Sequence, residues 1–256
     1  MSEGDYNAYR SVVESPTLRS IWAEVYGDRF WTDVDPPWTQ ATVDDVHFVT
    51  ARLSPAKSSR LVDLGCGSGA LARHWARNFA AQIEGLDANP NAIRLAQERT
   101  DDSELSNRIM SFRTCDIAAI PSPESTFDGA ASLDVLMYVP DKAKVLQEVA
   151  RILKSGARFA GTVFELRTPS AALALPAFVD YPGAFSAAGL TIESYEEADA
   201  WRRLLEGVTA HILEREPEIS RELHPQALAR VLRWARSRPS ELADSRRVRF
   251  CVRKLP

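Results

Sequence analysis

The chain has 256 residues, of which 45% are hydrophobic and 26% charged, and its formal net charge is −4 at pH 7. These proportions are typical of folded globular proteins and exclude disordered and fibrous classes. A chain of this length can bury one substantial core, so we expect a single domain. The negative net charge gives no general attraction to a phosphate backbone, and we expect no nucleic-acid partner.

The N-terminal residues do not resemble a secretory signal, because acidic residues occur early and an apolar run is missing. The longest apolar stretch, around residues 171–178, is too short to span a bilayer. Three widely separated cysteines and four histidines show no metal-ligand spacing. We therefore expect a cytoplasmic protein with reduced thiols, no membrane association and no metal.

Residues 8–53 have a helical pattern, interrupted at Asp35-Pro36-Pro37 and rich in aromatic side chains. From residue 60 onwards, short apolar strands alternate with amphipathic helices. The expected strands cover residues 61–64, 82–86, 109–114, 127–133, 157–164, 190–195 and 246–253. The expected helices cover residues 91–99 and 141–153, and another helix after residue 69 carries Leu71, Trp75 and Phe79 on one face.

This alternation predicts an α/β fold with a doubly wound, Rossmann-like sheet of seven strands, parallel and covered by helices on both faces. Residues 197–237 break the alternation with two helical stripes, divided near Pro217 and Pro225, and predict a helical cap inserted before the last strand. We expect one domain over residues 1–256. Its predicted parts are an N-terminal helical lid (1–55), a cofactor-binding core (56–195 and 246–256) and the helical cap (196–245).

A glycine-rich loop, Asp63-Leu64-Gly65-Cys66-Gly67-Ser68-Gly69, stands between the first strand and the next helix. Glycines in this position permit a tight turn with positive φ and let a ligand approach the backbone closely. Gly65, Gly67 and Ala70 also satisfy the G-x-G-x-x-A pattern of dinucleotide-binding folds. The loop alone leaves the identity of the cofactor open.

Asp87 ends the second strand, 22 positions after Gly65. A carboxylate there can accept hydrogen bonds from both ribose hydroxyls of an adenosine, which either NAD or S-adenosylmethionine would supply. The structural alternative is an acid at the start of the next helix, but Asn89 is well suited to cap that helix. We therefore expect Asp87 to bind a ribose.

Three further features resemble the successive motifs of class I S-adenosylmethionine-dependent methyltransferases of the small-molecule type. Asp63 precedes the first glycine by two residues, Cys115-Asp116-Ile117 ends the third strand, and residues 127–136 surround the fourth. The resemblance covers roughly residues 60–195. It implies S-adenosylmethionine as cofactor and transfer of its methyl group to an N, O or C atom of a small organic molecule, such as a natural-product intermediate.

The resemblance also implies roles for individual residues. The backbone around Gly65 and Gly67 would hold the methionine part of the cofactor, Asp87 the ribose and Asp116 the adenine amino group, with Asp63 an indirect partner. The full set of implied cofactor-binding residues is Asp63, Gly65, Cys66, Gly67, Gly69, Asp87, Ala88, Asp116, Ile117 and Leu133.

The acceptor is less well defined by the sequence. Methyltransferases that act on nucleobase nitrogens often carry Asn/Asp-Pro-Pro-aromatic after the fourth strand, whereas this chain has Ser132-Leu133-Asp134-Val135. That group is therefore disfavoured. Methyl transfer mainly requires that the nucleophile be aligned and water excluded, and a base is needed only for an acceptor that binds protonated.

The candidate catalytic residues, chosen by location, are Asp134, Tyr138 and His211. The candidate acceptor-binding residues are Glu165, Trp31 and Trp38. Each has a structural alternative, as a loop-end acid, a packing aromatic or an exposed helix residue. The arginine-rich stretch from residue 230 to residue 249 is interpreted as a solvated helix face and strand edge.

Two other functions remain open at this stage. The glycine pattern and Asp87 are compatible with an NAD-dependent oxidoreductase, which cofactor titration would distinguish. A protein with the methyltransferase fold could also have a non-methylating role such as cyclisation, which methyl transfer to any acceptor would exclude.

Overall fold

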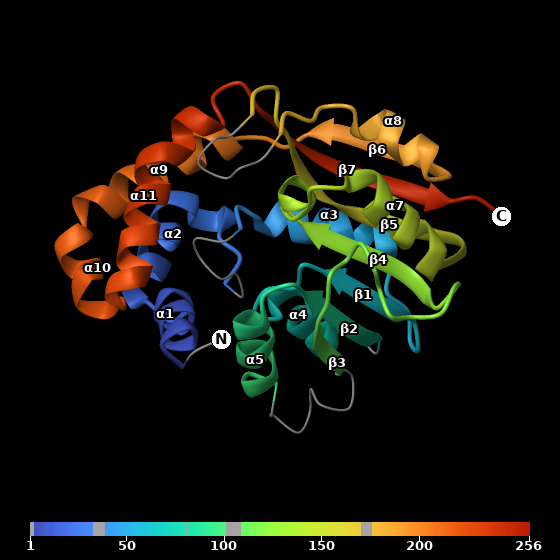
Figure 1. The fold of residues 1–256 in the computed structure, drawn as a ribbon, viewed down its shortest axis with the longest axis horizontal. Helices are drawn as coiled ribbons and strands as arrows, with labels where there is room; N and C mark the ends of the chain where they lie inside the picture. Colours follow the sequence, from blue (N-terminus) through green and yellow to red (C-terminus); the bar gives the residue numbers. More distant parts are fainter. Residues whose placement is uncertain (1–2, 33–38, 80, 101–108, 170–175) are drawn as a thin grey trace.

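The computed structural model describes residues 3–32, 39–79, 81–100, 109–169 and 176–256. Its strands form one sheet, with helices on both faces and a group of helices beyond one end (Figure 1). The strands are β1 (Arg60–Leu64), β2 (Gln82–Asp87), β3 (Ile109–Thr114), β4 (Phe127–Leu133), β5 (Leu153–Glu165), β6 (Leu190–Glu197) and β7 (Arg246–Lys254). The helices are α1 (Glu3–Val13), α2 (Pro16–Tyr26), η1 (Gly27–Arg29), α3 (Val43–Leu53), α4 (Ala70–Asn78), α5 (Pro90–Glu98), η2 (Leu136–Tyr138), α7 (Lys142–Ile152), α8 (Tyr181–Ala187), α9 (Trp201–Glu214), α10 (Glu216–Glu222) and α11 (Pro225–Glu241).

The sheet has seven strands in the order β3-β2-β1-β4-β5-β7-β6. The predicted doubly wound, Rossmann-like architecture is confirmed, with a strand at each of the seven expected places. The expectation of a parallel sheet is wrong for β7, which runs antiparallel to both β5 and β6. The reason is topological: β6 ends at the edge where the cap helices follow, so β7 starts at that edge and must run away from it.

The central strands are short and apolar because helices cover both of their faces. On one face α7 and α8 pack on the sheet through side chains such as Val145, Val149 and Phe185. On the other face α3, α4 and α5 contribute side chains such as Val49 and Trp75. The two apolar clusters hold the strand ends in fixed positions, which is what a binding site at the sheet edge requires.

The N-terminal segment has a break that the sequence analysis missed. The expected helical run over residues 8–53 ends at Val13 and restarts at Pro16, because the Ser15 side chain accepts a hydrogen bond from the Leu18 amide and caps α2. The expected interruption at Asp35-Pro36-Pro37, with Trp38, lies outside the described residues.

Helices from opposite ends of the chain form one helical layer. α1 and α2 pack against α9, α10 and α11 around buried side chains that include Ile21, Trp22, Val208 and Val231. The rings of Trp22 and Trp234 stack with their centroids 6.1 Å apart. Figure 1 shows this layer beyond the carboxyl ends of β1 and β4. No helix in the described part of the chain has the length and apolar character needed to cross a bilayer.

Candidate active site

A cavity of about 550 Å³ lies between the carboxyl ends of the central strands and the helical layer. Its volume is in the range of small-molecule sites. One wall is formed by the loop after β1 and by the residues that follow β2, β3 and β4. The opposite wall includes Tyr9 from α1 and Arg230 from α11, so both ends of the chain contribute to it.

The glycine loop has the backbone conformation that its sequence predicts. Gly65 and Gly67 have φ values of 75° and 54°, in the region that favours glycine. A Cβ at Gly65 would overlap the side chain of Val135, whereas the space around the Gly67 Cα is open. The loop therefore lies against the turn after β4 at Gly65 and presents bare backbone to the cavity at Gly67.

Gly69 differs from the other two glycines. It does not line the cavity, and a Cβ there would lie 2.6 Å from Cζ of Phe112. Its φ of 81° also begins α4 in a left-handed conformation. Packing and backbone conformation are sufficient to require a glycine here, whatever its predicted contact with a cofactor.

Three carboxylates line the cavity at the ends of adjacent strands: Asp63 in β1, Asp87 in β2 and Asp116 after β3. The two oxygens of Asp87 accept hydrogen bonds from the amides of Gly67 (2.9 Å) and Asn89 (2.8 Å), and burial raises its pKa despite these bonds. Asp87 thus braces the glycine loop while it faces the cavity.

Asp63 is buried without compensation. Within the described residues its Oδ2 atom has no hydrogen-bond partner. Burial, with a smaller contribution from the charge of Asp87, raises the pKa of Asp63 to about 7. An orphaned carboxylate oxygen at a cavity wall costs free energy unless a ligand or water donates to it, so the site fits a ligand with a positive or hydrogen-bond-donating group.

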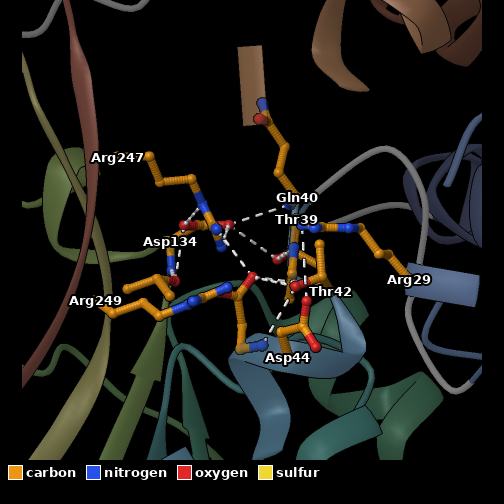
Figure 2. A network of polar contacts seen from close by, with 11 residues as sticks. Arg29, Thr39, Gln40, Thr42, Asp44, Asp134, Arg247 and Arg249 are labelled. Atoms are coloured by element: carbon orange, nitrogen blue, oxygen red, sulfur yellow. Dashed lines mark hydrogen bonds and ion pairs between the residues drawn. The ribbon is translucent and has the colours of Figure 1, made fainter. Parts of the chain in front are cut away.

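Asp134 is part of a buried ion network (Figure 2). Its carboxylate pairs with Arg247 through two contacts, at 2.9 and 3.1 Å, and accepts further hydrogen bonds from Thr162 Oγ1 (2.8 Å) and the Gln40 amide (3.1 Å). Arg247 also pairs with Asp45 at 2.9 Å. Asp134 also lines the cavity, but these contacts engage its acceptor positions and favour a structural anion over the predicted catalytic base.

Tyr138 and Trp31 do line the cavity. The Tyr138 hydroxyl oxygen accepts a hydrogen bond from Nη2 of Arg238 at 2.7 Å, and 42% of the residue is exposed. Trp31 is buried and packs edge-on against the ring of His74. Both predicted residues are therefore within the cavity wall, where they can contact a bound molecule.

His211 and Glu165 do not line the cavity, so the structure does not bring these two predicted residues together with the others. The His211 Nδ1 atom is 2.9 Å from the Gly207 carbonyl oxygen, one turn earlier in α9. Glu165 accepts a hydrogen bond from the Tyr195 hydroxyl at 2.6 Å and pairs with Arg246 at 3.2 Å, at the edge where β5 and β7 meet.

Several lining residues were not among the predicted ones. They are Tyr9, Thr39, Ala70, Leu71, Asn89, Ala92, Cys115, Val135, Val139, Pro140 and Arg230. Most of them are neighbours of predicted residues in the loops after β1, β2, β3 and β4. Tyr9 and Arg230 are harder to predict from the sequence. If helices cover the edge of a sheet, the residues on their inward side form the opposite wall of the cavity, but the sequence does not show which side is inward.

A family model described as a methyltransferase domain matches residues 62–161. "Methyltransferase phqN" from Penicillium fellutanum is 37% identical over 123 residues, which cover 48% of this chain and 37% of that protein. "27-O-demethylrifamycin SV methyltransferase" from Amycolatopsis mediterranei is 26% identical over 202 residues, which cover 73% of this chain and 74% of that protein. These matches support the class I S-adenosylmethionine-dependent methyltransferases as the family of this chain.

Solved structures agree with this family at the level of the fold. The [4+2]-cyclase SpnF has a TM-score of 0.75 and 22% identity, covering 100% of this chain and 97% of that one. A phosphoethanolamine N-methyltransferase 2 of Haemonchus contortus in complex with S-adenosyl-L-methionine has a TM-score of 0.71 and 18% identity, and the match covers 98% of this chain and 60% of that one. The family-model match favours S-adenosylmethionine over a dinucleotide as the cofactor, in line with the ligand of the Haemonchus contortus enzyme.

The ion network yields a first prediction. Asp134→Asn should destabilise the protein by about 3 kcal/mol, because it leaves the buried charge of Arg247 partly uncompensated. Thermal or urea unfolding measures this change. Glu165→Gln is the control, since its partner Arg246 is partly exposed and the loss should be smaller. An Asp134→Asn variant of unchanged stability that fails only in turnover would restore the catalytic assignment.

Asp63 yields a second prediction. Because its folded-state pKa of about 7 lies above its ordinary 3.8, the ligand-free protein loses stability as pH rises between these values. Asp63→Asn removes this penalty, so the variant should melt higher than the original protein at pH 8, by several degrees, with a smaller advantage at pH 5. Equal differences at both pH values would contradict the raised pKa.

Proposed function

We propose that the protein transfers the methyl group of S-adenosylmethionine to an N, O or C atom of a small organic molecule, in the cavity between the sheet and the helical layer. The observation that carries this proposal is the alignment of Asp63, Asp87 and Asp116 along one wall beside the open backbone of Gly67. Relatives whose names refer to small natural products, such as the rifamycin enzyme and norajmaline N-methyltransferase from Rauvolfia serpentina, support the acceptor class.

The residues of this wall fit the cofactor part by part. The orphaned oxygen of Asp63 suits the methionine ammonium group, and the bare backbone at Gly67 suits the methionine chain. Asp87 would accept hydrogen bonds from the ribose, and Asp116 from the adenine amino group. The apolar part of this wall, proposed to contact the cofactor, consists of Cys66, Ala88, Ile117 and Leu133.

When bound, S-adenosylmethionine supplies an electrophilic methyl group on a sulfonium. The remaining task of the protein is to align the nucleophile and keep water out. Trp31 offers an aromatic surface for an apolar or aromatic acceptor. The Tyr138 oxygen accepts a hydrogen bond from Arg238, and within the described residues its own hydroxyl proton has no acceptor. That proton can therefore hydrogen-bond the methyl acceptor, and we propose Tyr138 as the catalytic contact.

We propose that the N-terminal lid (1–55) and the helical cap (196–245) act as one cover over the core (56–195 and 246–256). The shared apolar cluster of α2, α9 and α11 supports this unit. α1 reaches across the cavity to α5, where Arg94 pairs with Glu3 at 2.7 Å and Tyr6 packs with Leu95. Opening of this contact would let the cofactor in.

A third prediction concerns cofactor affinity. Asp87→Ala should weaken binding of S-adenosylmethionine and S-adenosylhomocysteine about ten- to a hundredfold, because hydrogen bonds to an ionised acceptor are lost. Calorimetric titration measures the dissociation constants. Asp180→Ala is the matched control, since Asp180 caps α8 outside the cavity through the Gly183 amide. Unchanged affinity in the Asp87 variant would make this residue a loop brace only.

A fourth prediction concerns the reaction. With labelled S-adenosylmethionine and a panel of phenols, amines and carboxylic acids of natural-product type, we expect label in at least one acceptor. Omission of the protein and the Asp87→Ala variant serve as controls. Tight cofactor binding without label in any acceptor, together with a cyclised product, would favour the cyclisation alternative. The cyclase SpnF, which has a similar fold, is the precedent for it.

A further inference from the structure

The arginine-rich C-terminal stretch has an inward face that the sequence interpretation did not foresee. Arg230, Trp234 and Arg238 are spaced by four residues in α11 and so lie along one side of the helix. Arg230 lines the main cavity. Trp234 and Arg238 line a small second cavity, which shares Asp134 and Tyr138 with the first. Two arginines of the stretch are thus directed at the site instead of forming only a solvated face.

Arg238 is a buried cation with incomplete partners. It is 5% exposed, donates to Tyr138, and pairs with Glu241 at 3.7 Å. Its Nε and Nη1 atoms have no hydrogen-bond partner within the described residues. Buried N–H groups of a charged side chain are costly when unpaired, so Nε and Nη1 of Arg238 favour a further hydrogen-bond acceptor in this part of the site.

Arg230, unlike Arg238, lines the main cavity itself. It is exposed at the cavity and, in the part of the chain that the structure describes, forms no hydrogen bond or ion pair. It is also the one lysine or arginine among the described lining residues. A guanidinium held at a binding wall without a carboxylate partner can engage an oxyanion in a two-point hydrogen-bonded pair.

The two walls of the cavity therefore have opposite charge. Asp63, Asp87 and Asp116 lie on the sheet wall, whereas Arg230 lies on the helical wall with Arg238 behind it. Under the proposed function the sheet wall holds the cofactor, which leaves the helical wall for the acceptor. A neutral or cationic acceptor would leave the guanidinium of Arg230 unmatched, whereas an anionic acceptor would neutralise it.

We propose that the acceptor carries an oxyanion group, a carboxylate or a phosphate monoester, and that Arg230 determines this specificity. This inference rests on the proposed function for the location of the cofactor. Arg238, from the same helix, donates a hydrogen bond to Tyr138 and fixes the orientation of its hydroxyl, so that α11 helps to hold both the anionic end and the reacting atom of the acceptor.

Binding experiments test this without requiring turnover. Benzoate, phenyl phosphate and the neutral benzamide are titrated into the full-length protein, with and without S-adenosylhomocysteine, by ligand-observed NMR. We expect at least one anion to bind more tightly than benzamide, on the order of fivefold, and added salt to reduce the difference. Arg230→Met, which keeps the apolar stem, should abolish the preference.

Arg233→Met is the matched control, because it removes the same charge from the exposed side of α11 and should leave the preference intact. Absence of an anion preference at millimolar concentration in the original protein overturns the proposal. So does equal loss in both variants, which would indicate diffuse charge, or weaker binding of S-adenosylhomocysteine to Arg230→Met, which would assign Arg230 to the cofactor carboxylate. An anion preference that persists without any methyl transfer would instead leave this inference standing and remove the proposed function.

Discussion

The buried guanidinium of Arg247 connects three distant parts of the chain. It pairs with Asp134 after β4 and with Asp45 in α3, while Arg247 itself belongs to β7. Burial alone would raise the pKa of Asp45, yet Arg247 and Arg249 outweigh this effect and keep that pKa below its ordinary value. Such a network is costly to desolvate and is retained only where its geometry is nearly complete. Because Val135, next to Asp134, packs on Gly65, the network also determines where the glycine loop lies.

Much of the fold could be predicted because its central strands are buried on both faces. Such strands appear in the sequence as short apolar runs, and the helices between them show a single apolar stripe. The direction of β7 could not be predicted in this way, since alternation along the chain says nothing about which edge a strand starts from. The break before α2 was missed for a different reason: it depends on one capping hydroxyl, that of Ser15, in an otherwise continuous pattern.

The residues of the candidate site also fall into those that local sequence patterns predict and those that tertiary contacts position. Asp63, Asp87 and Asp116 were placed together from the sequence, because the carboxyl ends of parallel strands meet at one edge. The positions of Asp134 and His211 follow instead from tertiary contacts. The partner of Asp134 is Arg247, 113 residues further along the chain, and no local pattern connects them. His211 lies in the cap, but its ring is within hydrogen-bond distance of the backbone of its own helix and does not line the cavity. The side of α9 that faces the cavity depends on how the helix packs, which the sequence pattern does not show.

The two walls of the cavity also differ in the parts of the protein that form them. The sheet wall uses strand ends, glycine conformation and backbone groups, so its chemistry is bound to the fold itself. The helical wall uses side chains on α1 and α11, whose core packing is separate from that of the sheet. A substitution of Arg230, which shares no hydrogen bond or ion pair with the described residues of the sheet wall, should therefore change the proposed acceptor preference with little effect on the proposed cofactor wall, because sites without shared partners act nearly independently.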